Sequence, residues 1–418
     1  MKGLHGIIFS YEKENGLREL IENRVHGSVP FGGDYRIIDF ILSSMVNAGI
    51  TDVGVIMHGK CQSLLDHLGS GKSWDLSRNF GGRYRAVDFA LSSLVNAGVT
   101  DVGIVLHGNY QSLLDHLGTG KDWDLSRKRG GLKILPPFAY KREWGEEAFR
   151  GKIEALAGVR SYLDTIRQDY VVLSDSDTII NMPLEDVLAR HIATGADITA
   201  VCTAAGGDGR DTYFRLDGGG RITDTAYSLH TPSGYRCLNI FVLRTELLVQ
   251  LVTECISRNG YSLRRNILQE MGNRLKLYGY VYDGYAAHIS TLQNYYDRSM
   301  ELLDTGVRGR LFCPERPVYG KENDSPSSYI DPEGGCVNSL VADGCDIQGS
   351  VKNCVLFRNV RIEKGASVEN CILFKDTVVK RGAVLRGVIT DKYVTISENV
   401  TLMGHERYPI VIAKGATV

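Results

Sequence analysis

The sequence lacks long apolar runs and has no excess of charge of either sign. No apolar run approaches the roughly 18 residues that a membrane-spanning helix needs, and the short apolar stretch near the N-terminus is followed at once by charged residues. We therefore expect neither a membrane anchor nor a signal peptide. The formal net charge of −1 over 418 residues gives no electrostatic reason to expect a nucleic acid or a membrane surface as partner.

Paired cysteines are also missing. The nine cysteines are odd in number and none stands in CxxC spacing, so neither a disulfide framework nor a zinc site is supported. Buried free thiols in a reducing compartment are the simpler interpretation, and we expect a cytoplasmic protein.

An internal repeat is the most prominent feature of the first third of the chain. Residues 31–79 recur at 80–128, with 35 identities in the 49 aligned positions. Two copies are too few for a repeat array, which normally needs about three units. We interpret the repeat as a tandem duplication, or as the join of two related sequences, inside one domain.

Each copy is predicted to fold as a helix, a strand and a second helix. In the first copy these elements are expected at 36–49, which ends on Gly49, at 51–57 and at 61–69. Further strands are predicted by apolar, β-branched runs at 6–11, 169–177, 196–204, 237–243 and 275–283. Strands that alternate with helices indicate a Rossmann-like α/β domain with a mostly parallel sheet, which we place at 1–305.

The composition changes after residue 305. Residues 306–332 contain four prolines with polar spacers and are predicted to be a linker. Beyond the linker, NCVLF at 353–357 returns as NCILF at 370–374, and apolar residues recur every 17 positions, as at Val351, Val368, Leu385 and Leu402. Six-residue units, about three to a turn, are typical of a left-handed parallel β-helix, which we expect over 333–418.

Several of these segments together resemble one family. The segments SVPFGGDYRIIDFILSSMVNAGI, WDLSRKRGG and VVLSDSD, with the hexapeptide tail, resemble ADP-glucose pyrophosphorylase (glucose-1-phosphate adenylyltransferase). The resemblance covers almost the whole chain once one copy of the repeat is set aside. Within the family the chain is most similar to the GlgD-type subunit, a catalytically degenerate branch that partners a catalytic subunit. The resemblance implies a nucleotidyltransferase domain and a reaction of ATP with glucose 1-phosphate that requires Mg²⁺.

The resemblance also implies a glycine-rich loop and an arginine after the first strand, which bind the triphosphate. Here residues 11–17 read YEKENGL, so side chains replace the glycines that allow a phosphate to approach the backbone. Glu12 and Glu14 would repel the phosphates, and Gly16 stands at the arginine position.

A second phosphate-binding motif of the family, Arg-x-Lys-Pro, is only partly present. Arg24 is retained and is a candidate for nucleotide binding, whereas the lysine has become His26. A protonated His26 can pair with a phosphate, but we favour a solvated loop histidine without a role.

The family's metal site is incomplete. Asp177 stands at the position of the first metal-binding aspartate, and Asp175 and Asp177 alone have the spacing of a metal pair. The second aspartate of the family is replaced by His288. One carboxylate binds Mg²⁺ weakly, so we assign no metal ligand and no catalytic residue beyond a residual Asp177.

The nucleotide and sugar elements are altered as well. The Gly-Thr-Ala-Asp-Ala element that contacts the adenine side survives only as GKIEA at 151–155, in which Gly151 and Lys152 remain candidates for nucleotide binding. The Glu-Lys-Pro that grips glucose 1-phosphate has no counterpart in 212–235, and Cys237 replaces the serine of the following strand. Because each change removes a charge or a glycine that its step requires, we predict a degenerate site.

The resulting hypothesis is a regulatory or assembly subunit of a glucose-1-phosphate adenylyltransferase complex in glycogen biosynthesis. It would form a hetero-oligomer, a tetramer, with a catalytic subunit, and a sugar phosphate or a nucleotide would be the effector. One alternative is an independently active nucleotidyltransferase that uses His26, Asp177 and Lys152. Another is a hexapeptide-repeat acyltransferase, for which His405 is the only histidine in 331–418.

The duplication offers two candidates for one position in the family's sheet. The extra unit either adds a strand to the sheet through a right-handed crossover or is extruded with its apolar residues exposed. Chain continuity favours the first copy, but residues 82–85 and 109–111, which belong to the other copy, are more typical of the family. We therefore predict that the second copy occupies the usual position and that a Δ31–79 variant is soluble and at least as stable as the full chain.

Overall fold

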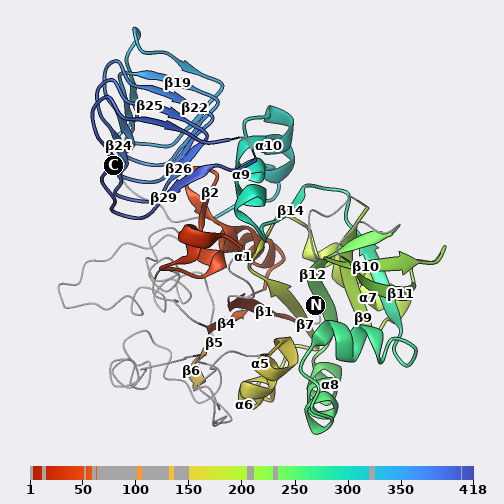
Figure 1. The fold of residues 1–418 in the computed structure, drawn as a ribbon. Helices are drawn as coiled ribbons and strands as arrows, with labels where there is room; N and C mark the ends of the chain where they lie inside the picture. Colours follow the sequence, from red (N-terminus) through yellow and green to blue (C-terminus); the bar gives the residue numbers. More distant parts are fainter. Residues whose placement is uncertain are drawn as a thin grey trace.

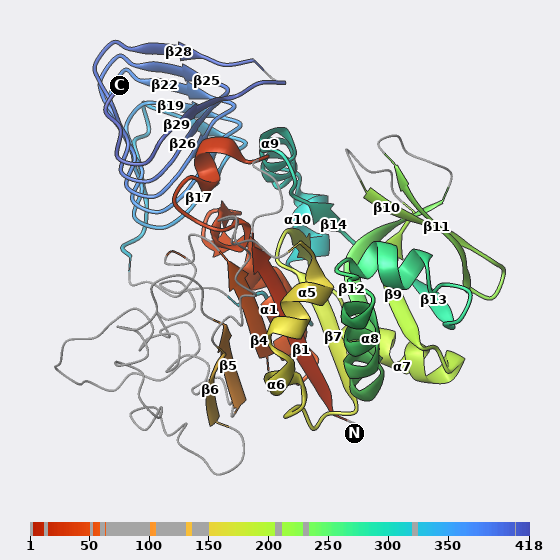
Figure 2. The ribbon, with the colours of Figure 1, turned by 60° about the horizontal axis from the view of Figure 1, so that its bottom comes forward.

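The chain forms an α/β domain and a stack of short strands that extends from it (Figure 1). In both ribbon views, helices α9 (Leu292–Glu301) and α10 (Thr305–Leu311) lie where these two parts meet (Figure 2). This computed structural model describes residues 3–11, 16–50, 53–58, 63, 101–105, 131–135, 150–204, 211–228, 234–319, 325–405 and 407–418.

One large sheet forms the centre of the α/β domain. Its strands in the described residues are β1 Leu4–Tyr11, β4 Val53–His58, β5 Asp101–Val105, β6 Gly131–Leu135, β7 Tyr170–Asp175, β9 Ile198–Thr203, β10 Asp211–Leu216, β11 Ile222–Ser228, β12 Tyr235–Arg244 and β13 Leu277–Val281. They follow the order β11-β10-β12-β7-β1-β4-β5-β6, with β9 beside β12 and β13. From β7 to β6 all neighbours are parallel, whereas β12 is antiparallel to β7, β9 and β10. The mostly parallel sheet is confirmed.

Helices cover both faces of this sheet. Because successive residues of a strand point to opposite faces, Ile7 and Phe9 of β1 belong to one apolar cluster and Ile8 to another. The first cluster includes residues of α5 Lys152–Gly158, α6 Arg160–Leu163, α8 Thr245–Ser257 and the π-helix Leu263–Gln269. The second includes residues of α1 Ile37–Asn47 and α7 Leu184–Thr194. Figure 2 shows α5, α6 and α8 together on one side of β1 and β7.

The two copies of the repeat supply neighbouring strands. The first copy's β4 pairs with β1 from Gly6 to Tyr11, and the second copy's β5 pairs with β4 one place further from the centre. The first copy also supplies α1, with the expected end at Gly49, whose φ is +67°. The helix predicted at 61–69 lies outside the described residues except for Ser63, which is helical.

The prediction that the second copy takes the position beside the first strand is therefore wrong. The first copy follows β1 directly in the chain, and four apolar residues of its helix α1 are fully buried: Ile37, Ile38, Phe40 and Ile41. The second copy's strand β5 adds to the sheet beside β4, as the crossover arrangement predicts, and the rest of that copy lies outside the described residues. A Δ31–79 deletion would remove α1 and β4 from this core, so the structure gives no support to the predicted stability of that variant.

Matched leucines in the two copies test this arrangement. We expect Leu42→Ala to lower the free energy of unfolding by about 2 kcal/mol, since Leu42 is 7% exposed and packs between α1 and the sheet. The matched variant is Leu91→Ala, the same substitution at the corresponding position of the second copy. Chemical denaturation measures the free energy of unfolding of both variants. A larger loss for Leu91→Ala, with Leu42→Ala close to the unchanged chain, would place the second copy in the core instead.

The C-terminal part is a three-sided parallel β-helix of five coils in the described residues. One side holds β15 Tyr329–Ile330, β18 Asp346–Ile347, β21 Arg361–Ile362, β24 Val378–Val379 and β27 Thr395–Ile396. The second holds β16 Cys336–Val337, β19 Ser350–Lys352, β22 Ser367–Glu369, β25 Val384–Arg386 and β28 Thr401–Met403. The third holds β17 Leu340–Val341, β20 Val355–Leu356, β23 Ile372–Leu373, β26 Val388–Thr390 and β29 Ile410–Ile412.

The 17-residue period read from the sequence is the coil repeat. Val351 pairs with Val368, Val368 with Leu385 and Leu385 with Leu402, each as a parallel neighbour. The left-handed hexapeptide β-helix is thus confirmed. The stretch 306–332, predicted as a linker, begins inside α10, and β15 lies near its end.

The α/β domain and the β-helix share one apolar cluster. Phe31 and Tyr295 come from the first part, and Phe357 and Phe374 come from the second. The Tyr295 and Phe374 rings lie 6.3 Å apart, and those of Phe357 and Phe374 lie 4.9 Å apart. Short elements line this junction: η1 Arg18–Ile21, η2 His26–Ser28, β2 Pro30–Phe31 and β3 Tyr35–Arg36. The two parts are therefore packed through a common core.

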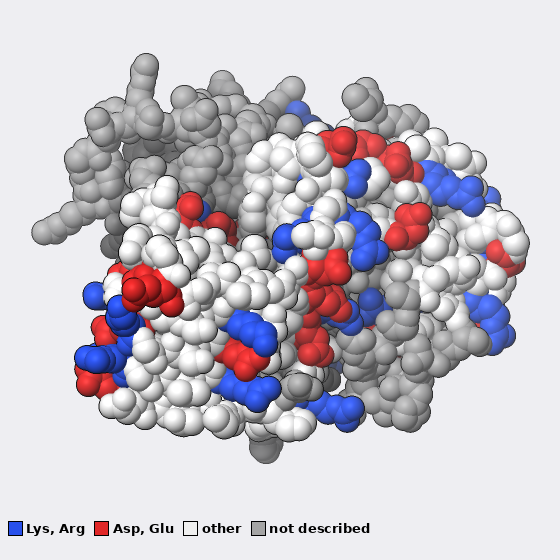
Figure 3. All heavy atoms as spheres, turned by 90° about the horizontal axis from the view of Figure 1, so that it is seen from above, with Lys and Arg blue, Asp and Glu red and all other residues white. Residues whose placement is uncertain are grey.

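The surface and the cysteines agree with the composition. On the face seen in Figure 3, basic and acidic side chains are interspersed over a largely uncharged surface.

Eight cysteines lie in the described residues; all are free and six are buried, as predicted. Among the helices that the structure describes, none combines the length and the apolar character needed to cross a bilayer.

Candidate functional site

Charged side chains gather where β7 ends. Asp175 is the last residue of β7, and Asp177 directly precedes β8 Thr178–Ile180. Strand β14 Ala286–His288 pairs antiparallel with β8 and places His288 opposite Thr178. The backbone N–H of Ile289 donates to the carbonyl of Asp177 at 2.8 Å, which holds the two segments side by side.

The imidazole of His288 lies between two carboxylates. Its Nε2 is 3.2 Å from Oδ2 of Asp177, and its Nδ1 is 3.6 Å from Oδ1 of Asp211, the first residue of β10. Asp211 is also 3.7 Å from Nη1 of the buried Arg236 on β12. Four segments of the chain thus bring two carboxylates, an imidazole and a guanidinium into one network.

A second ion pair involves Asp175, two residues before Asp177. Lys152, the first residue of α5, places its Nζ 2.8 Å from Oδ1 of Asp175, and both side chains are buried. The ammonium also lies 5.5 Å from the Phe9 ring and 5.6 Å from the Phe241 ring. A cation held by a carboxylate and two aromatic faces is satisfied without a ligand. Lys152, a candidate for nucleotide binding, therefore has an internal partner.

Gly151, the other candidate at this element, supports the start of α5. A Cβ atom at Gly151 would overlap the carbonyl oxygen of Tyr261. The same carbonyl accepts a hydrogen bond from the N–H of Ile153 at 3.1 Å. The glycine is thus required by close backbone packing.

Cys237 adjoins both ion pairs. The pKa of its thiol is raised to about 12, mainly by burial and in part by the carboxylates of Asp175 and Asp211, while the N–H of Asn239 and the charge of Lys152 oppose the rise. The thiol stays protonated at neutral pH and is a poor nucleophile.

Position 16 has no room for the arginine that the family resemblance implies. A Cβ atom at Gly16 would overlap the carbonyl oxygen of Ser290. The carbonyl of Gly16 in turn accepts from the N–H of Leu292 at 2.9 Å. The segment that follows His288 thus packs against the place from which a phosphate-binding arginine would extend.

The loop that carries His26 crosses the ends of β1 and β7. A Cβ atom at Gly27 would lie 2.8 Å from Oγ of Ser176 and 2.9 Å from Oγ of Ser10. His26 itself is 8% exposed, so the interpretation as a solvated histidine is wrong. Its loop is buried because Gly27 allows the backbone to pack directly on these two strand ends.

Arg24 points to the β-helix. Its Nη2 donates to both carboxylate oxygens of Asp391 at 2.8 Å, and both side chains are 4% exposed. The arginine retained from the phosphate-binding motif thus has an anionic partner inside the protein.

The residues present do not fit the Mg²⁺ ion that the family reaction requires. A magnesium site needs oxygen ligands that are open to the ion, but Asp177 faces His288 and Asp175 faces Lys152. Within the described ranges, no group of three or more His, Cys, Asp or Glu residues is arranged to hold a metal. The arrangement is a self-neutralised polar core without a place for a divalent ion.

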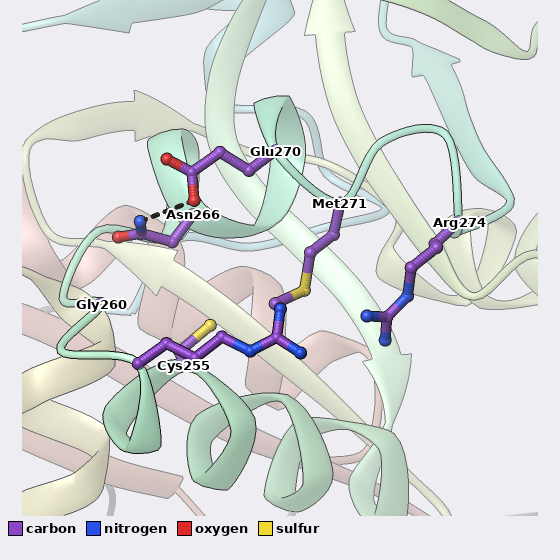
Figure 4. A pocket seen from close by; sticks show the side chains of 7 residues that line it. Cys255, Gly260, Asn266, Glu270, Met271 and Arg274 are labelled. Carbon is purple, nitrogen blue, oxygen red and sulfur yellow. Dashed lines mark hydrogen bonds between the residues drawn. The ribbon is translucent and has the colours of Figure 1, made fainter.

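A separate hollow of about 180 Å³ lies beside the C-terminal end of α8 (Figure 4). Arg258 and Arg274 line it, and both are paired with Glu254. Figure 4 shows Asn266 bonded to Glu270 across its upper side. Both arginines of the lining are thus held by one carboxylate of α8, and we assign no ligand to this hollow.

The fold and the site together define a nucleotidyltransferase-type α/β domain joined to a hexapeptide β-helix. Residues 78–214 match the nucleotidyl transferase family, and residues 327–407 match the GlmU-like C-terminal hexapeptide family. The first match begins next to the second copy of the repeat, although the first copy lies beside β1.

Full-length relatives are more specific. The chain is 34% identical to the glycogen biosynthesis protein GlgD of Bacillus subtilis over 410 residues, which cover 98% of this chain and 95% of the relative. It is 36% identical to GlgD of Geobacillus stearothermophilus, covering 86% and 81%. It is 29% identical to glucose-1-phosphate adenylyltransferase of Thermotoga neapolitana, covering 83% and 71%. The chain belongs to the GlgD family of glycogen biosynthesis proteins.

Two charged residues of this network have no signature in the sequence. Asp211 and Arg236 stand on β10 and β12 without any motif around them. The nearest signal is the neighbouring Cys237, which aligns with the sugar-facing serine of the family. His288 is recognisable in the sequence only as a lost aspartate, and nothing there predicts its contact with Asp177.

Proposed function

We propose that this chain is a regulatory or assembly subunit in glycogen biosynthesis that has little or no adenylyltransferase activity of its own. It would act by binding a catalytic subunit of the ADP-glucose pyrophosphorylase family as a hetero-tetramer in the cytoplasm. A sugar phosphate or a nucleotide would be its effector.

The observation that carries this proposal is the internal pairing of the charges that catalysis would need. Asp177 pairs with His288, Lys152 with Asp175 and Arg24 with Asp391. A nucleotidyl transfer needs free cations and a bound metal to stabilise the charge of the leaving pyrophosphate. In the part of the chain that the structure describes, these candidate groups are each held by a partner inside the protein, and a side chain at position 16 would overlap the carbonyl oxygen of Ser290.

The two alternatives receive less support. An independently active enzyme would use His26, Asp177 and Lys152, but His26 is buried and the other two are paired. An acyltransferase would need a free catalytic histidine, whereas Nδ1 of His405 accepts from the backbone of Arg407 at 3.2 Å.

The direct test is a pyrophosphate-release assay on the purified chain with Mg²⁺, ATP and glucose 1-phosphate. We expect no turnover above background, because the described residues of the site form no metal-binding group and its candidate phosphate ligands Lys152 and Arg24 are paired inside the protein. A turnover number of about 1 s⁻¹ or more, the low end for ordinary enzymes, would contradict the proposal.

A second arm tests the regulatory role. The chain is co-purified with a catalytic subunit from the same genome, and the activity of that subunit is measured alone and in the complex. We expect a stable complex whose apparent substrate affinity or response to sugar phosphates differs from that of the catalytic subunit alone. If the two proteins do not associate, the proposed partnership fails even when this chain is inactive.

A further inference from the structure

Two carboxylates from different parts of the chain converge on one imidazole ring. Asp177 precedes β8, Asp211 begins β10, and their oxygens lie 3.2 Å and 3.6 Å from the two nitrogens of His288. The side chains of these three residues are 15%, 9% and 18% exposed. Like charges this close and this sheltered from water repel each other unless a positive group or a donor lies between them.

The position of the ring is fixed by the backbone. His288 pairs with Thr178 across β14 and β8, and Ile289 donates to the carbonyl of Asp177. A side chain at position 288 therefore starts beside Asp177 whatever its chemistry. The charged groups near the ring have partners of their own. Arg236 contacts the other carboxylate oxygen of Asp211, and Lys152 pairs with Asp175.

We propose that His288 takes the place of a divalent metal ion in this chain. The ring occupies the position between Asp177 and Asp211 that an ion bound by both carboxylates would occupy: its Nε2 is hydrogen-bonded to Asp177, and its Nδ1 lies 3.6 Å from Asp211. The network is thereby independent of metal. This inference rests on the proposed function, since it explains how a degenerate site stays folded without Mg²⁺.

A carboxylate at position 288 should make the network depend on a metal ion. In His288→Asp three carboxylates would meet in a sheltered space, where they repel in the absence of an ion and supply the oxygen ligands that Mg²⁺ and Mn²⁺ prefer. The matched control is His288→Asn, which has nearly the same size as aspartate, keeps a donor amide and adds no charge. The double variant Asp177→Asn/His288→Asp removes one of the proposed ligands.

The experiment measures binding of Mn²⁺ by electron paramagnetic resonance, and thermal unfolding in EDTA and in Mn²⁺, on the full chain without substrates or partner. We expect one bound Mn²⁺ in His288→Asp, a midpoint lowered in EDTA, and a rise of roughly 5 °C when Mn²⁺ is about a hundredfold above its Kd. The unchanged chain, His288→Asn and the double variant should bind no stoichiometric Mn²⁺ and show no shift.

Stoichiometric Mn²⁺ binding by the unchanged chain would overturn the proposal, as would a folded His288→Asp that binds none. If His288→Asp folds only in Mn²⁺, the proposal is supported. If it folds in neither condition, the Mn²⁺ titration of the unchanged chain tests the proposal: absence of stoichiometric binding supports it, and stoichiometric binding overturns it. Because no turnover is measured, failure here is separate from failure of the proposed function, which would appear as adenylyltransferase activity or as loss of the complex.

Discussion

Deleting residues 331–418 is expected to leave a chain that aggregates and no longer assembles with a catalytic partner. The β-helix covers Phe31 and Tyr295 of the α/β domain with Phe357 and Phe374, all of them no more than 4% exposed. Without the β-helix this apolar cluster would face water, and an exposed cluster of that kind promotes association. Size-exclusion chromatography with light scattering measures the aggregation, and co-purification measures the complex.

Substitutions on the end coils separate loss of the core from loss of subunit contacts. Val337 on the first coil is 59% exposed and Met403 on the last is 63% exposed, so Val337→Ser and Met403→Ser leave the shared core intact. We expect both variants to remain soluble, with weaker binding of the partner if the ends of the β-helix carry contacts. A well-behaved chain of residues 1–330 that still binds a catalytic subunit would overturn the prediction.

Replacing Asp391 by alanine is expected to lower the free energy of unfolding by about 3–5 kcal/mol, the usual effect of removing one partner of a buried ion pair. Its carboxylate accepts two hydrogen bonds from Arg24, and it lies among the positive charges of Arg24, Arg36 and Lys392. Without Asp391 the guanidinium of Arg24 stays buried with no counter-charge. Urea unfolding at neutral pH measures the change.

The adjoining substitution Lys392→Met is a control that should raise the free energy of unfolding, whereas Asp391→Ala should lower it. The pKa of Lys392 is lowered to about 7, mainly by burial and in part by the positive charges of Arg36, Arg24 and Lys414, while Asp391 opposes the shift. The folded chain thus binds this proton less tightly than the unfolded chain, so the charge costs stability below pH 7 and the cost fades as the pH rises. We expect Lys392→Met to stabilise the chain more at about pH 6 than at about pH 9. If Asp391→Ala and Lys392→Met both destabilise the chain equally at low pH, the junction is not governed by charge.

Local patterns in the sequence predicted most of the architecture. Apolar spacing located the first strand, α1 and β4, and the 17-residue period located the β-helix, because burial of one face is a property of neighbouring residues. The same patterns could not rank the two copies of the repeat. Both carry nearly the same apolar residues, so only the packing of the whole sheet decided that the first lies beside β1.

In the candidate site, too, some features could be predicted from the sequence and others depended on the tertiary structure. The sequence by itself determined which residue types stand in these segments, and through the family resemblance it predicted that the glycines, the arginine, the lysine and the second aspartate are missing. Only the tertiary structure decided what replaced them. His288 reaches Asp177 across 111 residues, and Arg24 reaches Asp391 across 367. Such pairings depend on strand order and on the docking of the β-helix, and no local spacing of residue types encodes either one.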